Sequence, residues 1–384
     1  MKKFISVILS AVMILSFCSF GFAAEDSKAL RFDDDGYFRI LQFADIQDGP
    51  FLLNPTKNFI KDVLEETDPD LVILTGDNIS GGGCWTDALA RHGIYCFMSI
   101  FENYGVPVAA VFGNHDSEGA ANKEEMMEMY EAYDCFVGCA GEDLTGCGNY
   151  NLPIMSSDGS KVAYNIWCID SLTYNRHPED KNDVAYYEND LGGYACVHKD
   201  QIDWYVKTSD ELKAANGGKP VPSMMFQHII VPEIFDVLVK TESGYALPEG
   251  VKGNLGETPC PPPYNNGQFD AALKQGDVVA MFFGHDHTNS FEVSYKGVDL
   301  VNTPGVTFSS YGDHNRGARV IDIKESDTST YTTEVIRWLE FYDAENNAAA
   351  MNEFILNGNE FSTGEKIEAF FNYIFAKIAE IFTF

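Results

Sequence analysis

Five short polar segments of the chain carry the residue types that bind divalent metal ions. They read FADIQ, TGDN, GNHD, FQH and GHDH, and each follows an apolar run that is typical of a strand. Carboxylate, amide and imidazole groups suit ions such as Mn, Zn or Fe(II). One histidine at the end of a strand is usually structural, but repeated ligand-type residues at such positions indicate a metal site. The candidate ligands are Asp45, Gln47, Asp77, Asn114, His228, His285 and His287.

Two of these segments contain candidate ligands that are two residues apart. In an extended strand, residues i and i+2 point the same way. We therefore expect Asp45 and Gln47 to face one ion, and His285 and His287 to project together toward two neighbouring ions. Two adjacent ions can lower the pKa of bound water, so the pattern favours a two-metal hydrolase site.

Apolar runs that alternate with amphipathic stretches predict an α/β sheet. The runs are apolar on both faces, as strands covered on both sides are; they read YFRILQF, DLVILTGD, VPVAAVFG, VAYNIWCID, VPSMMFQH and DVVAMFFGH. Helices are expected from Asn54 and Pro55 onward and between Asp200 and Gly217. Ligands bind where the carboxyl ends of such strands converge, which brings the five polar segments to one crevice.

The last third of the chain predicts more strands and then a helix. SFEVSYKG, VDLVNTPG, ARVIDI and TTEVIRW are expected to extend a second sheet, within a domain spanning 30–342. Residues 343–384 predict a linker and an amphipathic helix. This helix could contact a membrane surface or dock on protein, and docking or self-association is favoured because it has no basic face. Its apolar face holds Ile367, Phe370, Phe371, Ile374, Ile378 and Phe382.

Residues 1–24 predict a secretory signal peptide. Two lysines precede an apolar stretch that ends in small residues, with cleavage expected near Ala23 or Ala24. An uncleaved anchor is the alternative, although the stretch is short for a membrane span. We therefore expect a secreted or extracytoplasmic protein. Of nine cysteines, one lies in this leader, and the remaining eight predict disulfides.

The chain is strongly acidic. Its formal net charge is −32, and loss of Lys2 and Lys3 with the leader makes it −34. This charge argues against nucleic acid and against anionic membranes as partners. A phosphate-bearing substrate needs a locally positive site, which two divalent ions would supply against two carboxylates and a hydroxide.

The five segments, in this order, resemble the calcineurin-like metallophosphoesterase superfamily, which includes the purple acid phosphatases. The stretches most similar to its secreted branch of Dcr2-type and plant purple-acid-phosphatase-like proteins are ILQFADIQ, LTGDNI, VFGNHD, FQHIIVPE, FFGHDHTN and RGARVI. The resemblance covers residues 36–325. It implies a four-layer α/β/β/α sandwich with a dinuclear metal centre.

The resemblance also implies a role for each residue of the site. The first ion would be held by Asp45, Gln47 and His287; the second by Asn114, His228 and His285; and both by Asp77. His115 would protonate the leaving oxygen or stabilise the transition state, and Asp116 would orient it. The implied reaction is attack of a hydroxide held between the ions, on phosphomonoesters first and on phosphodiesters as the alternative.

Two positions depart from the family pattern. Gln47 stands at the usual place of a histidine, and its amide oxygen is a harder and weaker ligand. We expect looser binding of the first ion and a shift from Zn toward Mn, Fe(II) or Mg. Other branches of the superfamily have glutamine here, which favours a working enzyme over a secreted binding protein. Ser80 replaces the tyrosine of purple acid phosphatases proper, so a colourless protein is expected.

A few residues have open assignments. Glu233, Arg316 and Arg319 are candidates for substrate contact, and a structural ion pair is an equal alternative for Arg319. The tyrosine-rich segment 171–199 is expected either to edge the pocket or to cover the core. No G-x-S-x-G segment supports a serine hydrolase.

Overall fold

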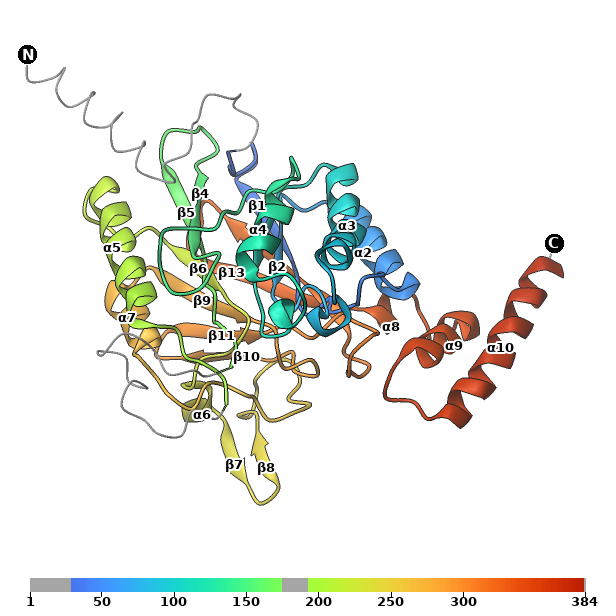
Figure 1. The fold of residues 1–384 in the computed structure, drawn as a ribbon. Coiled ribbons are helices and arrows are strands. Elements are labelled where there is room, and N and C mark those ends of the chain that lie inside the picture. Colours follow the sequence, from blue (N-terminus) through green and yellow to red (C-terminus); the bar gives the residue numbers. More distant parts are fainter. Residues whose placement is uncertain (1–28, 175–192, 383–384) are drawn as a thin grey trace, which may run out of the picture.

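The computed structural model describes residues 29–174 and 193–382. Two sheets stack face to face, and helices cover their outer faces (Figure 1). One sheet has the order β13 (Asp327–Arg337), β12 (Gly317–Lys324), β1 (Tyr37–Phe43), β2 (Leu71–Thr75) and β3 (Val108–Val111). The other has the order β10 (Glu292–Tyr295), β11 (Val298–Asn302), β9 (Val278–Phe283), β6 (Ser223–Phe226), β5 (Val162–Cys168) and β4 (Tyr150–Met155).

The central strands are apolar on both faces because each strand lies between two cores. In β1, Ile40 points into the core between the sheets, whereas Leu41 points into the core under the helices. Ile73 and Leu74 of β2 alternate in the same way. β1, β2 and β3 run parallel, as do β5, β6 and β9. Parallel strands that are buried on both sides read as continuous apolar runs, as the sequence does.

The helices form the two outer layers. The five-stranded sheet is covered by α2 (Asn54–Thr67), α3 (Asp87–Tyr104), α4 (Lys123–Glu131) and α8 (Trp338–Phe341). The six-stranded sheet is covered by α5 (Lys199–Ala215), α6 (Ile234–Val237) and α7 (Gln268–Gln275). The predicted four-layer α/β/β/α sandwich is confirmed. A short hairpin of β7 (Val239–Thr241) and β8 (Gly244–Ala246) extends from the body.

The placement of the last four strands corrects the prediction. Only β10 and β11 extend the six-stranded sheet, whereas β12 pairs antiparallel with β1 and β13 follows it. Strand propensity carries no information about which distant partner completes a ladder. The edge strand β4 was not predicted, and Pro153 within it is tolerated because β4 lies at an edge.

The segment predicted as a linker contains a helix. α9 (Ala348–Asn357) places Phe354 against Trp338, in the core that lies under the helices of the five-stranded sheet. α10 (Thr363–Phe382) follows and packs on α9. Among the described helices, none combines the length and apolar character needed to cross a bilayer. The predicted signal peptide lies outside the described residues.

The expected disulfides are absent at five of the cysteines. Burial raises the pKa of Cys147 and of Cys168 to about 12, which keeps both groups as protonated, unreactive thiols. For these five, the sulfur serves packing and weak hydrogen bonds, and the disulfide prediction is wrong. The free thiols are those of Cys84, Cys96, Cys147, Cys168 and Cys260.

Arg319 of β12 is a structural residue that joins the two sheets. Its guanidinium is fully buried and donates to Glu292 Oε1 at 3.1 Å and to Thr303 Oγ1 at 3.0 Å. The structure therefore confirms the ion-pair alternative for this residue. Arg316 is likewise engaged, because its Nη2 donates to Glu360 Oε2 at 3.0 Å.

Replacing Arg319 with alanine is expected to destabilise the protein by about 3 kcal/mol, because the change removes one partner of a largely buried ion pair. The free energy of unfolding from urea titration measures this effect. Arg91→Ala, an exposed arginine on α3, is the matched control and is expected to change stability by less than about 0.5 kcal/mol. Equal effects of the two substitutions would contradict the structural role.

Candidate metal centre

Every predicted ligand follows the carboxyl end of a central strand. Asp45, Asp77 and Asn114 come after β1, β2 and β3 of one sheet; His228 comes after β6, and His285 and His287 after β9, of the other. All seven candidate ligands are buried, with at most 8% of each residue exposed. The centre therefore straddles the seam between the two sheets.

The ligand pairs do not lie on extended strands, which corrects the reason given for their spacing. Asp45, Gln47, Asp77 and His285 have φ angles of 51°, 36°, 48° and 71°, in the left-handed region. These four are half of the eight non-glycine residues with positive φ in the described part of the chain. Each such residue costs on the order of 1 kcal/mol and persists only where its surroundings fix it. The direction of these side chains is therefore set by left-handed backbone after the strands, and not by the two-residue repeat of an extended strand.

Hydrogen bonds across neighbouring loops hold this backbone. The Asp45 N–H donates to Gly76 O at 3.1 Å, and the Gln47 N–H donates to Asp77 O at 2.9 Å. Gly76 has a φ of 85° and lies too close to His228 to carry a side chain. The loops after β1 and β2 are thus locked to each other.

Asp77 lies between the other ligands. Its Oδ2 is 3.1 Å from His228 Nε2 and 3.4 Å from Gln47 Nε2. Ligand atoms of Asp77, His228 and His285 lie within 4.8 Å of one another. On the other side, His287 Nε2 is 3.3 Å from Asp45 Oδ1.

Asp45, Asp77, His228 and His287 each use one polar atom for support and point another toward the centre. His228 Nδ1 donates to Thr75 O at 2.9 Å and His287 Nδ1 to Tyr311 O at 2.8 Å, which leaves Nε2 of both rings for the centre. Asp45 Oδ2 accepts from the His285 N–H at 3.0 Å, and Asp77 Oδ1 accepts from the His115 N–H at 2.7 Å.

The residues present fit a metal centre because several of their inward atoms make no hydrogen bond and contact only one another. Within the described residues, four buried oxygen or ring-nitrogen atoms of the centre make no hydrogen bond, although leaving such an atom unpaired costs about 1–3 kcal/mol. All four can coordinate a divalent ion. They are Asp45 Oδ1, Gln47 Oε1, Asn114 Oδ1 and His228 Nε2.

The electrostatics of the centre also favour a cation. Burial lowers the pKa of His228, but the charges of Asp77 and Asp45 outweigh this and raise the pKa to about 9. His285 lies farther from the carboxylates, and burial together with His228 lowers its pKa to about 3. The negative potential is therefore concentrated between Asp45 and Asp77, where the ions are expected.

The family model for calcineurin-like phosphoesterases matches residues 38–289, more than half of the chain and the whole set of candidate ligands. The chain belongs to the calcineurin-like phosphoesterase family. This calcineurin-like phosphoesterase is 29% identical to "Probable inactive purple acid phosphatase 14" of Arabidopsis thaliana, over 82% of each chain. It is 28% identical to "Probable inactive purple acid phosphatase 28" of the same plant, over 84% of each chain. "Phosphatase DCR2" of Saccharomyces cerevisiae is 26% identical, over 69% of this chain and 46% of that one. The family implies divalent metal ions.

Beside His115, the structure of this calcineurin-like phosphoesterase places a different carboxylate from the one predicted. Asp116 is buried and accepts from the N–H groups of Gly113 at 2.7 Å and Ile79 at 3.0 Å. It shapes the GNHD loop and does not reach the His115 ring. Glu118 does: its Oε2 is 2.8 Å from His115 Nδ1, and both side chains are 36% exposed.

Three tyrosines lie beside the candidate ligands of this phosphoesterase, and no motif identified them individually. Tyr311 stacks on His287 with ring centroids 4.1 Å apart, and Tyr194 meets His285 edge-on at 4.5 Å. Tyr174 stacks on Tyr194, and its hydroxyl donates to Glu118 Oε1 at 3.4 Å. Both ends of the tyrosine-rich segment thus edge the site. Its middle, residues 175–192, lies outside the described residues.

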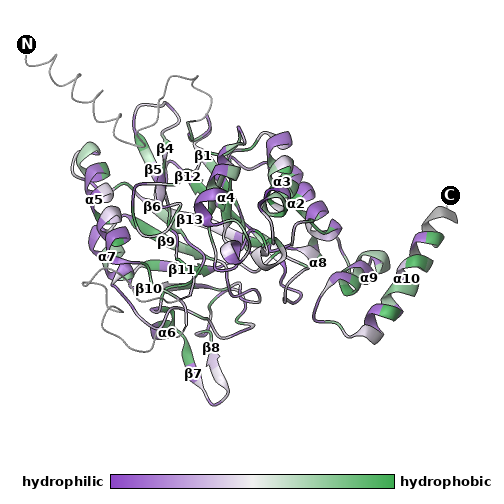
Figure 2. Cartoon of the chain, in the orientation of Figure 1, coloured by the Kyte–Doolittle hydropathy of each residue, from purple (hydrophilic) through white to green (hydrophobic). Residues whose placement is uncertain are grey.

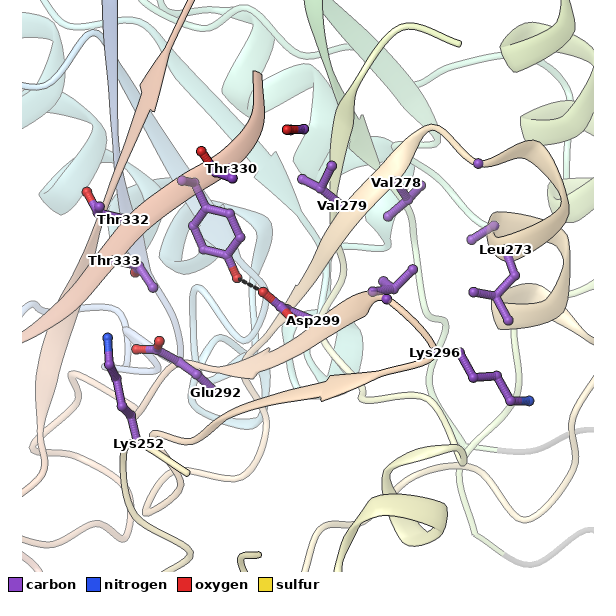
Figure 3. A pocket seen from close by; sticks show the side chains of 16 residues that line it. Lys252, Leu273, Val278, Val279, Glu292, Lys296, Asp299, Thr330, Thr332 and Thr333 are labelled. Atoms are coloured by element: carbon purple, nitrogen blue, oxygen red, sulfur yellow. Dashed lines mark hydrogen bonds between the residues drawn. The ribbon is translucent and has the colours of Figure 1, made fainter. Parts of the chain in front are cut away.

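A separate groove of about 630 Å³ lies away from the metal centre (Figure 3). Lys252, Glu292, Asp299 and Lys296 lie around it, between β13 and the β9–β11 edge. Its carboxylates are engaged, because Glu292 pairs with Arg319 and Asp299 accepts the Tyr331 hydroxyl at 2.9 Å.

Glu233, the third candidate for substrate contact, accepts a hydrogen bond from Asn265 at 2.8 Å.

Replacing Gly113 with alanine is expected to weaken metal binding by at least about tenfold, the effect typical of disturbing the support of a ligand. A Cβ at Gly113 would lie 2.2 Å from Asp77 Oδ1, so that carboxylate would have to move. Calorimetric titration of the metal-stripped protein with Mn²⁺ measures the change. Gly49→Ala is the control, since a Cβ there meets nothing within 4 Å. Unchanged affinity in Gly113→Ala would show that Asp77 is not a ligand.

Proposed function

We propose that this protein hydrolyses phosphate esters with two divalent metal ions, and that phosphomonoesters are its main substrates. One observation carries the proposal: the seven candidate ligands are all buried at the ends of central strands, and four of their atoms that can coordinate an ion have no hydrogen-bond partner within the described residues. In a protein that kept this fold but bound no metal, buried polar atoms such as these are expected to be hydrogen-bonded.

The ligands divide into two sets around Asp77. Asp45, Gln47 and His287 would hold the first ion, Asn114, His228 and His285 the second, and Asp77 both. When bound, the ions polarise the phosphoryl group and make water more acidic. Phosphodiesters remain the alternative substrates, because the same centre serves both classes.

The residues of the chain then supply orientation and a proton. His115 lies next to the ligand Asn114 and exposes its ring, so its Nε2–H is placed to donate to the oxygen of the departing alcohol. Glu118 Oε2 accepts from His115 Nδ1–H and holds the ring in that orientation. Tyr174 in turn donates to the other oxygen of Glu118. Glu118 and Tyr174 act through His115 and are positioning residues.

Gln47 motivates a second candidate, a secreted binding protein that retains the fold with little turnover. The names of the two Arabidopsis relatives contain the word "inactive". Against this candidate, the Gln47 amide oxygen is buried and unpartnered, and it can coordinate an ion in place of an imidazole. A rise of many orders of magnitude in Gln47→His, from near-zero activity, would favour the binding protein.

The decisive experiment is a panel of phosphomonoesters, phosphodiesters and nucleotides assayed with Mn²⁺, Fe²⁺, Zn²⁺ and Mg²⁺, together with elemental analysis of the protein. We expect two ions per chain, and faster turnover of monoesters with Mn²⁺ or Fe²⁺ than with Zn²⁺. At most one ion and no turnover under any condition would exclude the proposed hydrolase. Faster turnover of diesters would assign the alternative substrate class.

The iron-loaded protein is expected to be colourless. Ser80 stands where purple acid phosphatases proper have the tyrosine whose phenolate binds ferric iron, and a serine hydroxyl gives no comparable charge-transfer band. Absorption spectra of the iron-loaded and metal-stripped protein check this. A strong visible band in the iron-loaded sample would contradict it.

We also propose that the protein is exported and that its leader is cleaved near Ala23 or Ala24. The leader composition supports this, because two lysines precede an apolar stretch that ends in small residues. The mass and N-terminal sequence of the protein recovered outside expressing cells test it, and retention of residues 1–24 would exclude it.

A further inference from the structure

One face of α10 is apolar and exposed along its length. Its six large side chains repeat at helical spacing, and Figure 2 shows apolar residues recurring along the helix. The exposed fractions are 55% for Ile367, 50% for Phe370, 56% for Phe371, 40% for Ile374, 66% for Phe375 and 44% for Ile378. Within the described residues, nothing covers this face.

α10 is attached to the protein through a different side of the helix. Ala369 is 2% exposed, and it lies roughly 200° around the helix from Ile367 at 3.6 residues per turn. An amphipathic helix of a globular protein ordinarily buries its apolar stripe and exposes its polar one. Here a small residue makes the contact, and the isoleucines and phenylalanines face outward.

We propose that this face binds a lipid surface without net charge, such as a bilayer of zwitterionic headgroups. The width of the apolar face favours lipid over a second helix. Phe370 and Phe375, at its two edges, are separated by roughly 140° around the helix. A two-helix seam covers only a narrow stripe and would leave these two phenylalanines in water, whereas a lipid surface covers the whole arc.

Charge gives an independent reason. With a formal net charge of −32, two copies of this chain repel each other, and so do the chain and an anionic membrane. An uncharged surface carries no such penalty. The exposed Glu365 and Asn372 lie on the other side of the helix and stay in water when the apolar face is buried, and Glu368 lies at the edge of that face.

The place of α10 in the molecule is compatible with this contact. It is the last helix of the chain and stands to one side of the sandwich, joined to it through α9 (Figure 1). The helix therefore lies in the headgroup region with its axis along the surface, since it lacks the apolar character to cross a bilayer.

Co-sedimentation with phosphatidylcholine vesicles tests the proposal, using the chain without residues 1–24 so that the apolar leader does not contribute. We compare the unsubstituted chain with Phe371→Glu, on the apolar face, and with Asn372→Glu, one residue on and on the polar side. Both substitutions add one negative charge to α10. We expect Phe371→Glu to weaken vesicle binding at least tenfold and Asn372→Glu to leave it nearly unchanged, with hydrolysis of soluble esters unaffected in both.

Three results would overturn the proposal. A chain that stays in the supernatant but sediments as a dimer, which Phe371→Glu dissociates, would assign the face to a second copy. Binding only to vesicles that contain phosphatidylglycerol would exclude an uncharged surface as the target. Equal losses in Phe371→Glu and Asn372→Glu would show that the orientation of the helix is irrelevant. Failure of the proposed hydrolase activity leaves this test intact, because vesicle binding is measured without turnover.

Discussion

Replacing Asp77 with asparagine is expected to abolish hydrolysis of all phosphate esters, by at least about a thousandfold, and to lower the metal content from two ions to one or none. Asp77 is the one ligand assigned to both ions. It is 1% exposed, and one of its oxygens is 3.1 Å from His228 Nε2. Asparagine has nearly the same shape but removes the negative charge and replaces one oxygen with an NH₂ group that cannot coordinate. Elemental analysis and turnover of p-nitrophenyl phosphate measure the two effects.

Asp68→Asn is a matched control for this experiment. Asp68 also has a left-handed backbone, with a φ of 43°, but it lies at the C-terminus of α2 and its carboxylate accepts the Tyr104 hydroxyl. Asparagine tolerates this conformation well, so both variants are expected to fold. Circular dichroism confirms that point for each variant. Two bound ions and ordinary turnover in Asp77→Asn would disprove the assignment of Asp77 as the shared ligand.

Replacing His115 with alanine is expected to slow hydrolysis of alkyl phosphates by about 10²–10⁴-fold, the usual contribution of a general acid. The loss on p-nitrophenyl phosphate is expected to be much smaller, because nitrophenolate leaves readily without a proton. Glu118→Gln is expected to show the same dependence on the leaving group with a smaller loss, since the His115–Glu118 contact of 2.8 Å orients the ring. The ratio of kcat for the two substrates is the measurement.

Two further variants separate positioning from general structural damage. Glu118→Asp keeps the charge and is expected to recover part of the alkyl phosphatase activity. Glu128→Gln, an exposed glutamate on α4, is expected to behave as the unsubstituted protein. If His115→Ala slowed both substrates equally, the residue would support the adjacent metal ligand and would not donate the proton.

The placement of the candidate ligands at the ends of central strands could be predicted from the sequence, because both their types and their positions in the chain are informative. Asp45, Asp77, Asn114, His228 and His285 all follow buried strands, and the converging loops at those strand ends bring them together. The backbone conformation that directs these side chains into the site could not be predicted. Left-handed backbone at aspartate, glutamine and histidine is rare, and here it depends on hydrogen bonds between loops that only the folded chain supplies.

The carboxylate that contacts the His115 ring could not be predicted from the sequence either. Asp116 is adjacent in sequence, but its side chain turns inward to the N–H groups of Gly113 and Ile79. Glu118 lies on the same side as the His115 ring because the short helix Asp116–Glu118 turns back. Sequence separation alone does not determine which of two nearby carboxylates reaches a ring.

The division of the strands between the two sheets follows from long-range pairing. β12 is separated from its partner β1 by most of the chain, and Tyr37 lies opposite Lys324. The apolar alternation that identified β12 as a strand is equally compatible with either sheet. By contrast, the four-layer arrangement could be predicted, because strands that are apolar on both faces require cover on both sides.

Because the candidate ligands come from both sheets, metal binding is expected to change the stability of the protein as well as its activity. Four candidate ligands follow strands of one sheet and three follow strands of the other, so ions held between them would tie the halves of the molecule together. Ligand binding to the native state alone raises the unfolding free energy by about 2.7 kcal/mol when the free ion is at a hundred times its dissociation constant. The export proposed above would leave the protein dependent on the ion supply of its surroundings. Its lifetime against proteases and heat would then follow the local abundance of manganese or iron, apart from any effect on turnover.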